Sequence, residues 1–268
     1  MSEPHAPSHG LRLVSYNILD GALGRYDPVY ETLAYLDADV VAVCEADDPK
    51  GLAYIADKLS MEHLLAEANH SSHHVAVLTR LPVEQMINLG VKIPHLENAA
   101  MQVVLRPTPD AAPVRLIVAH LTAGLQAEAE QKRLAELDSI LAFLDAQPPM
   151  PTLIAGDLNA SAPYHPFDPD ALPPHRRARL ADRDYQLDHT VIQRLLDAGY
   201  IDAHRQTHTD APPPHTFTTG FPALKLDYIF ISPDLSDRLV DADVETGGFA
   251  PYCSDHYPVW AQLRPPKD

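Results

Sequence analysis

The stretch "LIAGDLNA", residues 153–160, is an apolar run that reaches a glycine and then presents two polar side chains two positions apart. The run predicts a buried strand over residues 152–156. Gly156 is expected to let the backbone turn tightly where this strand ends. The stretch therefore predicts a core strand that delivers Asp157 and Asn159 together at its end.

The other predicted strands are short runs of apolar and β-branched residues bounded by turn residues. Their mixture of continuous and alternating apolar runs indicates sheets that are buried on at least one face. These strands are expected at residues 11–16, 39–45, 74–79, 101–106, 114–120, 226–232 and 258–263.

Two helices are predicted between the strands. Asp27 followed by Pro28 is typical of an N-cap and a first helical residue, so a helix is expected to continue through Leu36. A longer helix is expected from about Leu125 to Asp145. Its leucines form one apolar stripe that belongs to the core: Leu134, Leu137, Leu141 and Leu144.

Proline is frequent, with 26 residues, and is dense over residues 161–184 and 210–216. Such stretches predict long loops without regular helices or strands. We find no internal repeat and no linker in the chain of 268 residues. One domain is therefore expected over residues 11–264, with a flexible N-terminal segment at 1–10 and a C-terminal tail at 265–268.

The charge of the chain limits its partners. It has 37 acidic and 20 basic residues, and the formal net charge of −17 repels polyanions. This repulsion acts over a Debye length of roughly 8 Å at physiological salt. Proteins that bind duplex DNA usually carry a basic footprint, which this chain lacks globally. A nucleic-acid partner is possible but disfavoured.

The cysteines and the N-terminus bear on location. Cys44 and Cys253 are too few for a disulfide framework and have no zinc-site spacing, so we expect two buried thiols. The first ten residues, MSEPHAPSHG, contain no apolar segment. No window approaches the ~18 consecutive apolar residues of a membrane span. The expected location is the cytoplasm.

Polar side chains stand at the ends of several predicted strands, as they do after the first one. A single Asp in such a place is more often a turn residue or a helix cap. Several together indicate a shared site, because carboxylate and amide oxygens are the ligands that Mg²⁺ prefers. The side chains are Asn17, Glu45, His120, Asp157, Asn159, Asp227, Asp255 and His256.

The segments that carry these side chains resemble, in the same order, the motifs of the endonuclease/exonuclease/phosphatase superfamily. GDLNA and SDHYPV are the specific ones, whereas SYN alone is weak. The segments are SYN (15–17), DVVAVCE (39–45), AHL (119–121), GDLNA (156–160), LDYIF (226–230) and SDHYPV (254–259).

The resemblance implies a DNase I-like α/β (α+β) fold. This fold is a four-layered sandwich of two mostly antiparallel β-sheets flanked by helices, with the site at strand ends along one edge. The resemblance also implies hydrolysis of a phosphoester with Mg²⁺ or Mn²⁺. The hydrophobic periodicity is compatible with this architecture but does not select it.

Water attack on a phosphoester needs an activated nucleophile and a clamp on the developing charge. Read beside the family, Asp157 is expected to orient and deprotonate the water, and Asn159 to hold a phosphoryl oxygen or that water. Glu45 and Asn17 are expected to hold the metal, with Asp255 in the same shell.

Two histidines complete the expected site. His256 is expected to hydrogen-bond the phosphoryl oxygen, while Asp227 accepts from its other ring nitrogen and fixes its tautomer. In family members with an HL motif, a histidine lies near the phosphate and can serve the leaving group. His120 is the corresponding residue, and a histidine is a natural acid near neutral pH.

The chain departs from some DNA-repair members just before the strand at 74–79. Those members have an aromatic residue and a glycine there, whereas this chain has Ser72, His73 and His74. The departure counts against an abasic-site nuclease. We expect these histidines to be surface polar residues rather than part of the site, although both readings remain open.

Four arginines follow the GDLNA motif in an otherwise acidic chain: Arg176, Arg177, Arg179 and Arg183. Guanidinium groups bind phosphate or carboxylate in a bidentate manner, so Arg176, Arg177 and Arg179 are candidates for substrate binding. A solvent-exposed run of charges explains the pattern equally well.

The sequence thus predicts a Mg²⁺- or Mn²⁺-dependent phosphoesterase. Its expected substrate is a phosphodiester or phosphomonoester of a small or medium phosphorylated compound, cleaved by direct attack of water. A DNA or RNA nuclease of the same superfamily is the first alternative. A non-catalytic relative is the second, and the presence of Glu45, Asp157 and His256 counts against it.

Overall fold

The computed structural model describes residues 10–108, 111–211 and 214–265. The predicted flexible segment and the predicted tail fall almost entirely on residues 1–9 and 266–268, which lie outside the described residues. The division of the chain into one domain with two flanking segments therefore stays a prediction.

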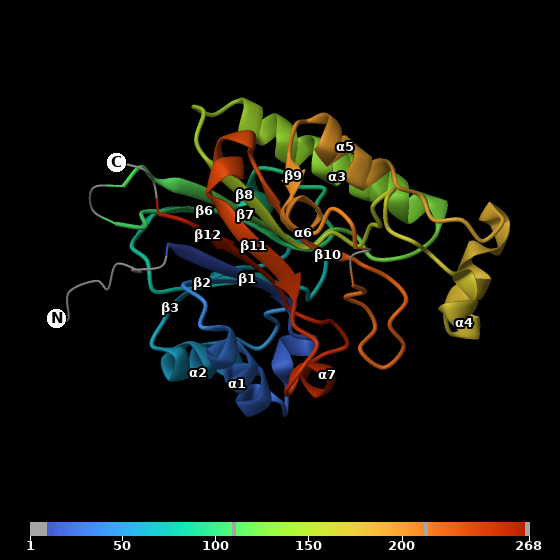
Figure 1. Ribbon diagram of the computed structural model, residues 1–268, viewed down its shortest axis with the longest axis horizontal. Helices are drawn as coiled ribbons and strands as arrows, with labels where there is room; N and C mark the ends of the chain where they lie inside the picture. The colour runs from blue at the N-terminus through green and yellow to red at the C-terminus, as the bar shows by residue number, and fades with distance from the viewer. Residues whose placement is uncertain (1–9, 109–110, 212–213, 266–268) are drawn as a thin grey trace.

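Two six-stranded sheets lie face to face (Figure 1). The first has the strand order β11-β12-β1-β2-β4-β3, and the second has the order β5-β6-β7-β8-β10-β9. The strands of the first are β1 (Leu11–Asn17), β2 (Val40–Cys44), β3 (Glu62–Ala66), β4 (Val75–Thr79), β11 (Leu239–Val244) and β12 (Val259–Leu263). Those of the second are β5 (Val83–Asn88), β6 (Ala100–Leu105), β7 (Val114–Ala119), β8 (Thr152–Asp157), β9 (Ile201–Asp202) and β10 (Asp227–Ile231).

Helices cover the outer faces of both sheets (Figure 1). Helices α1 (Tyr26–Leu36) and α2 (Pro49–Leu59) pack on the first sheet, whereas α3 (Ala127–Asp145) and α5 (Thr190–Asp197) pack on the second. None of the helices in the described part of the chain is long and apolar enough to cross a membrane. The short helices are α4 (Pro174–Arg177), α6 (Ala203–Thr207), α7 (Ala250–Cys253), η1 (Asp20–Ala22), η2 (Leu89–Val91), η3 (Pro169–Ala171), η4 (Ala178–Arg183) and η5 (Pro233–Arg238).

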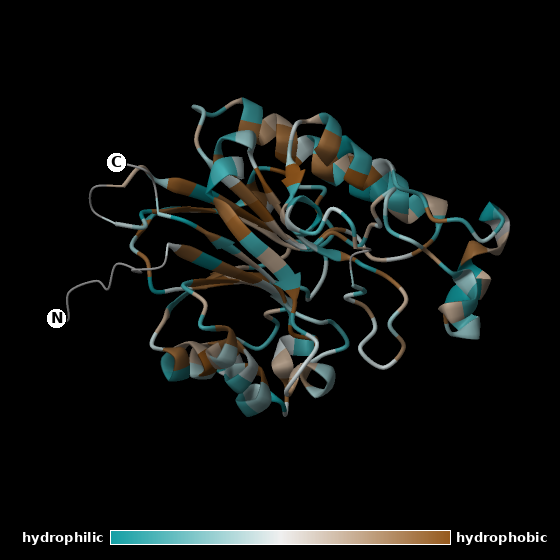
Figure 2. Ribbon diagram, viewed as in Figure 1, coloured by the Kyte–Doolittle hydropathy of each residue, from teal (hydrophilic) through white to brown (hydrophobic). Residues whose placement is uncertain are grey.

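The layers follow from the alternation of side chains along each strand. On β1, Leu13 faces the second sheet and Val14 faces α1 and α2. On β7, Leu116 faces the first sheet and Ile117 faces α3 and α5. Figure 2 shows the result, since the strands are mainly hydrophobic while the outer faces of the helices are polar. The predicted four-layered sandwich of two mostly antiparallel sheets is confirmed.

Each sheet contains one parallel pair near its centre, β1 with β2 and β7 with β8. Parallel neighbours end at the same edge of a sheet. Strands β10 and β12 run antiparallel to β8 and β1, so they begin at that edge. The register places Asp227, the first residue of β10, directly opposite Asp157, the last residue of β8. The topology therefore collects strand termini, with their polar side chains, at one edge.

Both predicted helix starts were wrong by a few residues. Helix α1 begins at Tyr26, and Asp27 lies in its first turn, where its carboxylate accepts a hydrogen bond from the Tyr54 hydroxyl (2.7 Å). The long helix begins at Ala127, and Leu125 lies before it, packed against a separate hydrophobic cluster.

The proline-dense stretch at 161–184 was predicted to contain no regular helix, and this prediction was wrong. It contains η3, α4 and η4. Pro169 and Pro174 occupy the first positions of η3 and α4, where a helix has no use for the missing N–H. The described residues of the second stretch, 210–211 and 214–216, form neither helix nor strand, as predicted.

The mechanism predicted for Gly156 was also wrong. Strand β8 continues through Gly156 to Asp157, so no turn occurs there. Gly156 has a φ of +140°, and a Cβ at this position would lie 2.0 Å from the carbonyl oxygen of Ala119 on β7. Glycine is needed here because it allows close approach of the β7 and β8 backbones at the end of β8.

Gly156→Ala should lower the free energy of unfolding by at least about 2 kcal/mol, because the added methyl group meets backbone that cannot move aside. Chemical denaturation followed by circular dichroism measures the loss. Gly24→Ala is the matched control, since Gly24 also has a positive φ (+76°) but open space at the Cβ position. Equal losses in the two variants would show that backbone strain, not the approach of β7, explains the glycine.

Candidate active site

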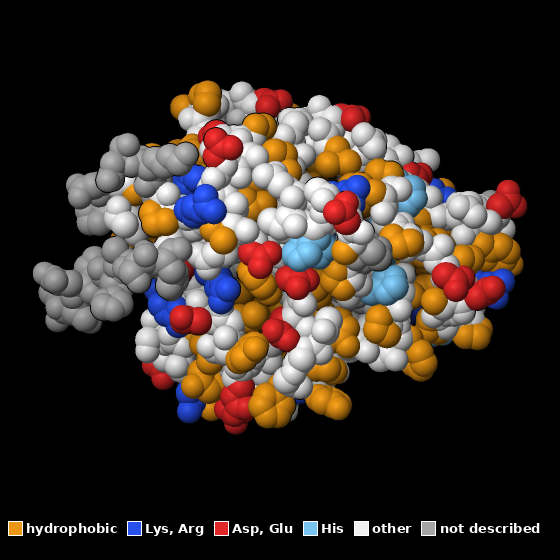
Figure 3. Space-filling view, viewed as in Figure 1, with side chains coloured by type: hydrophobic (Ala, Val, Ile, Leu, Met, Phe, Trp, Pro, Cys, Tyr) orange, Lys and Arg blue, Asp and Glu red, His pale blue; other side chains and the backbone are white. Residues whose placement is uncertain are grey.

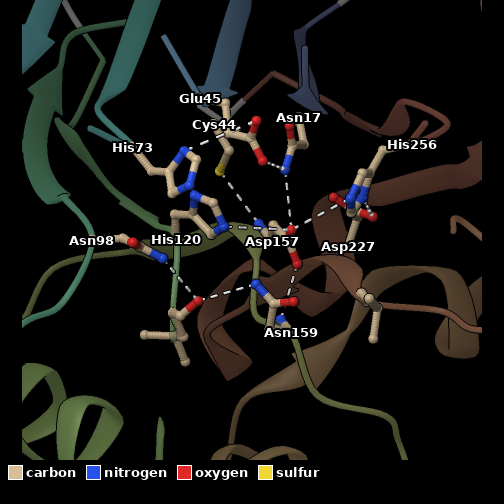
Figure 4. A network of polar contacts seen from close by, with 12 residues as sticks. Asn17, Cys44, Glu45, His73, Asn98, His120, Asp157, Asn159, Asp227 and His256 are labelled. Atoms are coloured by element: carbon tan, nitrogen blue, oxygen red, sulfur yellow. Dashed lines mark hydrogen bonds and ion pairs between the residues drawn. The ribbon is translucent and has the colours of Figure 1, made fainter. Parts of the chain in front are cut away.

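Figure 4 shows close together the strand-end side chains that the sequence singled out, except Asp255. They come from the carboxyl ends of β1, β2, β7 and β8 and from the starts of β10 and β12. Hydrogen bonds and close ionic contacts connect Asn17, Glu45, His120, Asp157, Asn159, Asp227 and His256.

Asp157 lies at the centre of this network and is only 2% exposed. Its Oδ1 accepts a hydrogen bond from the backbone N–H of Asn159 (2.9 Å). Its Oδ2 accepts one from Asn17 Nδ2 (3.1 Å), and His120 Nε2 and His256 Nε2 each lie 3.6 Å from the same oxygen. One buried carboxylate oxygen therefore faces three nitrogen atoms.

Burial raises the pKa of Asp157 to about 7, against the opposing effects of His256 and of the hydrogen bonds from Asn159 and Asn17. The backbone is fixed as well, because the Asp157 N–H donates to Cys44 Sγ (3.4 Å). A held carboxylate with a pKa near neutrality can take a proton at physiological pH and release it again.

His256 and Asp227 form a buried pair, and they are 4% and 0% exposed. His256 Nδ1 lies 2.8 Å from Asp227 Oδ2, and the ring of Phe217 packs against the imidazole with 4.6 Å between centroids. Burial alone would lower the pKa of His256, but the carboxylates of Asp227 and Asp157 outweigh it and raise the pKa to about 10. The ring is therefore protonated at neutral pH, with Nε2 directed at Asp157.

His120 differs from His256 in its charge. It is buried, and burial lowers the pKa of its imidazole to about 4 even though Glu45 lies nearby. Its Nδ1 has no hydrogen-bond partner among the described residues. The ring is therefore neutral at physiological pH, and a role as an acid requires the negative charge of a substrate to restore its proton.

Glu45 follows β2 in a left-handed backbone conformation, with a φ of +56°. Its Oε1 accepts a hydrogen bond from Asn17 Nδ2 (2.9 Å), and its Oε2 accepts one from the backbone N–H of Asp20 (2.9 Å). Burial opposes ionisation of Glu45, but the Asp20 N–H, the nearby His120 and the Asn17 amide outweigh burial and lower the pKa. A non-glycine residue at positive φ costs free energy, so these contacts hold Glu45 in place.

His73 lies beside the strand-end cluster, although its side chain is 37% exposed. Its Nδ1 lies 3.1 Å from Asp47 Oδ2 and 4.0 Å from Glu45 Oε2, and its ring centroid is 5.5 Å from that of His120. The hydrogen bond with Asp47 raises the pKa of His73, although burial opposes it. Sequence reasoning missed Asp47 altogether. Its position two residues after Glu45 was the available signal.

Two groups of described residues present possible metal-ligand atoms that all lie within 4.8 Å of one another. One group is Glu45, Asp47 and His73, and the other is Asp157, Asp227 and His256. The buried Oδ1 atoms of Asp227 and Asp255 have no hydrogen-bond partner among the described residues. Unpaired carboxylate oxygens in a crowded acidic site match the oxygen donors that a hard divalent cation needs.

Asp255 and Asn159 occupy the margins of the site. Asp255 belongs to neither ligand group, but burial raises its pKa, and His256 and Glu45 are close enough to influence it. Asn159 has a left-handed backbone with a φ of +50°, and its Nδ2 donates to the Leu121 carbonyl (3.0 Å). The Asn159 amide is thus held beside Asp157 by the loop that follows His120.

The four arginines of the loop after β8 divide into two kinds. Arg177 and Arg183 form ion pairs within the loop, with Asp170 (2.6 Å) and Asp188 (2.8 Å). Arg176 and Arg179 instead line a cavity of about 280 Å³ beside Asn159. The other lining residues are Ala123, Gly124, Leu125, His175, Phe217, Leu224 and Leu226.

Figure 3 shows one face of the molecule, on which acidic side chains are scattered across the middle. Basic side chains on this face lie mainly near the two chain ends, at the left of the view. This distribution agrees with the net charge of −17.

A sequence profile described as the Endonuclease/Exonuclease/phosphatase family matches residues 14–256, which confirms the resemblance read from the motifs. No curated protein sequence matches the chain.

Solved structures share the fold at low sequence identity. An AP endonuclease from Archaeoglobus fulgidus is 18% identical, with a TM-score of 0.72 over 94% of this chain and 99% of that chain. The 3' phosphatase NExo from Neisseria, bound to a product DNA hairpin, is 18% identical, with a TM-score of 0.71 over 95% and 99%. Humanized D. rerio TDP2 is 16% identical, with a TM-score of 0.67 over 96% and 100%.

Asp227→Asn should lower the pKa of His256, because the carboxylate favours the charged imidazole. NMR titration of the ring in metal-free protein measures the shift, with His256→Gln used for assignment. In wild type, the pair stabilises the fold fully below about pH 6.5, and this contribution is lost as the pH rises through the folded pKa. Asp243→Asn, which removes a carboxylate 3.5 Å from His204, is the control. An unchanged His256 pKa in Asp227→Asn would show that the pair is not coupled.

Proposed function

The chain belongs to the endonuclease/exonuclease/phosphatase family, and from this premise we propose that it is a divalent-metal-dependent phosphoester hydrolase. The observation that carries the proposal is the convergence of Asn17, His120 and His256 on one oxygen of buried Asp157. A carboxylate in this setting suits proton transfer from a water molecule. The reaction is hydrolysis of a phosphodiester or phosphomonoester by direct attack of water.

Asp157 is assigned as the general base. The Asn159 N–H fixes the orientation of the carboxylate, and burial keeps its pKa in the range where it can accept a proton from water. The side chain of Asn159, held by the Leu121 carbonyl, is assigned to position a phosphoryl oxygen or the attacking water. Holding the water and the phosphate in the reactive orientation lowers the entropic part of the activation barrier.

Glu45 and Asp255 are assigned as ligands of Mg²⁺ or Mn²⁺. When bound, such a cation stabilises the negative charge that develops on the phosphoryl oxygens. Asn17 presents its NH₂ group to Glu45 and Asp157, while its oxygen accepts from the Leu19 N–H. We therefore assign Asn17 to aligning the two carboxylates. Its predicted role as a metal ligand would require the side-chain amide to flip, so that its oxygen faced the cation.

The two histidines that face Asp157 are assigned to the phosphate. His256, kept protonated by Asp227, can donate from Nε2 to a phosphoryl oxygen. His120 is neutral before substrate binds, so the charge of a phosphate is needed before it can protonate a leaving group. The two rings thus divide charge stabilisation and proton donation between them.

A small or medium phosphorylated compound is the proposed substrate. The net charge of −17 disfavours a polyanion, and the cavity of about 280 Å³ beside Asn159 is near the lower limit for ligand pockets. A nuclease is the second candidate, favoured by the likeness of the fold to an AP endonuclease and to NExo. Location in the cytoplasm stays a prediction.

Wild-type protein with Mg²⁺ or Mn²⁺ should hydrolyse members of a panel of phosphomonoesters, phosphodiesters and oligonucleotides. Asp157→Asn should lower kcat by about a hundred- to ten-thousand-fold, because it removes the base. Circular dichroism should show an intact fold. Near-normal turnover by Asp157→Asn would remove this residue from the mechanism. Oligonucleotides as the only substrates, with a steep salt dependence of binding, would select the nuclease.

Glu45→Gln should weaken Mg²⁺ or Mn²⁺ binding by about tenfold or more, because an amide lacks the negative charge that the cation needs. Titration calorimetry measures the affinity without relying on activity. Glu62→Gln removes a carboxylate from an exposed position on β3 and should leave binding unchanged. Equal affinities in Glu45→Gln and wild type would show that Glu45 is not a ligand.

A further inference from the structure

We propose that the cavity beside Asn159 binds the part of the substrate beyond the scissile phosphate, and that this part has a compact apolar or planar body carrying a second anionic group. The two charges are bound at different places, the scissile phosphate at Asp157 and the second anion at Arg176 and Arg179. The inference rests on the proposed function, since it concerns the leaving group of the same reaction.

The position of the cavity supports this division. Asn159, whose backbone N–H holds the Asp157 carboxylate, forms part of the cavity wall. Phe217 forms another part and packs against the ring of His256, with 4.6 Å between centroids. On one side the cavity wall includes Asn159, which contacts Asp157 directly, and on the other it includes Phe217, which His256 separates from Asp157. A substrate with its phosphate at Asp157 extends into it directly.

The lining of the cavity has two chemical characters. Leu125, Leu224 and Leu226 supply an apolar wall, and Leu224 and Leu226 belong to a buried hydrophobic cluster. Arg176 and Arg179 supply two guanidinium groups. Among the described lining residues none is acidic, although the chain carries 37 acidic residues. This combination suits an amphipathic anion rather than a cation or a wholly apolar group.

The arginine geometry favours an external ligand. The guanidinium of Arg176 lies over the Phe217 ring, 4.2 Å from its centroid, so the stacked pair presents a flat surface to the cavity. Neither Arg176 nor Arg179 forms an ion pair within 4.0 Å among the described side chains, whereas Arg177 and Arg183 do. Guanidinium groups that remain unpaired beside a cavity are available for bidentate binding of carboxylate or phosphate.

The size of the cavity restricts the leaving group. A volume of about 280 Å³ lies at the lower end of the range for small-molecule pockets, roughly 300–1,000 Å³. This space accepts an aromatic ring with one anionic substituent, but not a nucleic-acid duplex. The chemical class is therefore a phosphoester whose alcohol part carries its own carboxylate or phosphate.

The test compares two substrates that differ only at the far end of the leaving group, phenyl phosphate and 4-carboxyphenyl phosphate, together with their methyl phosphodiesters. Wild type should prefer the carboxylated member in kcat/KM. The Arg176→Gln/Arg179→Gln double variant should lower that preference about tenfold or more, mainly through KM, as for a lost charge-assisted hydrogen bond. Arg194→Gln removes an exposed arginine from α5, where it pairs with Asp138, and should leave the preference unchanged.

Two outcomes would overturn the inference while leaving the proposed function intact. One is that wild type hydrolyses both members equally well. The other is that the double variant keeps the wild-type preference, or that Arg194→Gln loses as much of it, which would indicate a general effect of net charge.

Absence of hydrolysis of every ester would instead count against the proposed function. Calorimetric binding of 4-carboxyphenyl phosphate then still decides about the cavity. Binding that is lost in the double variant but kept in Arg194→Gln supports the cavity as the anion site. Binding unaffected by the double variant overturns it.

Discussion

The arrangement of the site depends on the two parallel strand pairs in an otherwise antiparallel fold, β1 with β2 and β7 with β8. A purely antiparallel sheet alternates strand ends and strand starts along each edge. A parallel pair places two adjacent carboxyl ends at the same edge instead. Because both sheets do this at facing positions, Glu45 and Asp157 come within reach of the same amide, that of Asn17.

This convergence concentrates ionisable groups where water is scarce. Burying a charge costs free energy unless the charge is paired and hydrogen-bonded. The charged His256 ring lies between Asp227 and Asp157, while Asn17 and backbone N–H groups hold Glu45 and Asp157. Unpaired oxygens remain on Asp227 and Asp255. The hydrogen-bonding capacity of the site is thus not fully used by the described protein groups.

Many of the strands could be predicted because the information for them is local, whereas the layered architecture was implied by the resemblance of the motifs and not by the periodicity. Continuous apolar runs predict central strands, and the polar residues that end them predict the meeting of side chains such as Asp157 and His256. Strand β3 was missed because its exposed start, Glu62 and His63, breaks the apolar pattern of an edge strand. Strand β11 was missed because aspartates interrupt its apolar residues.

The errors at the site concern distant contacts. Only the approach of Ala119 explains why Gly156 lies within a strand, and no local pattern reports that approach. His73 enters the site because the chain returns beside Asp47, which sequence spacing does not reveal. The sequence of the arginine run likewise does not reveal which guanidinium group lines a cavity and which one pairs with a nearby aspartate. Arg177, for example, pairs with Asp170.

Cys44 lies where the ends of the two sheets meet. Its thiol accepts from the Asp157 N–H and points at the Ala119 carbonyl (3.7 Å), and burial raises its pKa. The thiolate is the nucleophile that attacks alkylating reagents, so this buried, protonated sulfur is unreactive while the sheets stay together. Its labelling rate therefore reports how often the two sheets separate at the edge that carries the candidate site, and peptide mass spectrometry can separate that signal from labelling of Cys253. The alkylation rate of Cys44 is thus a built-in probe of local opening between the two sheets.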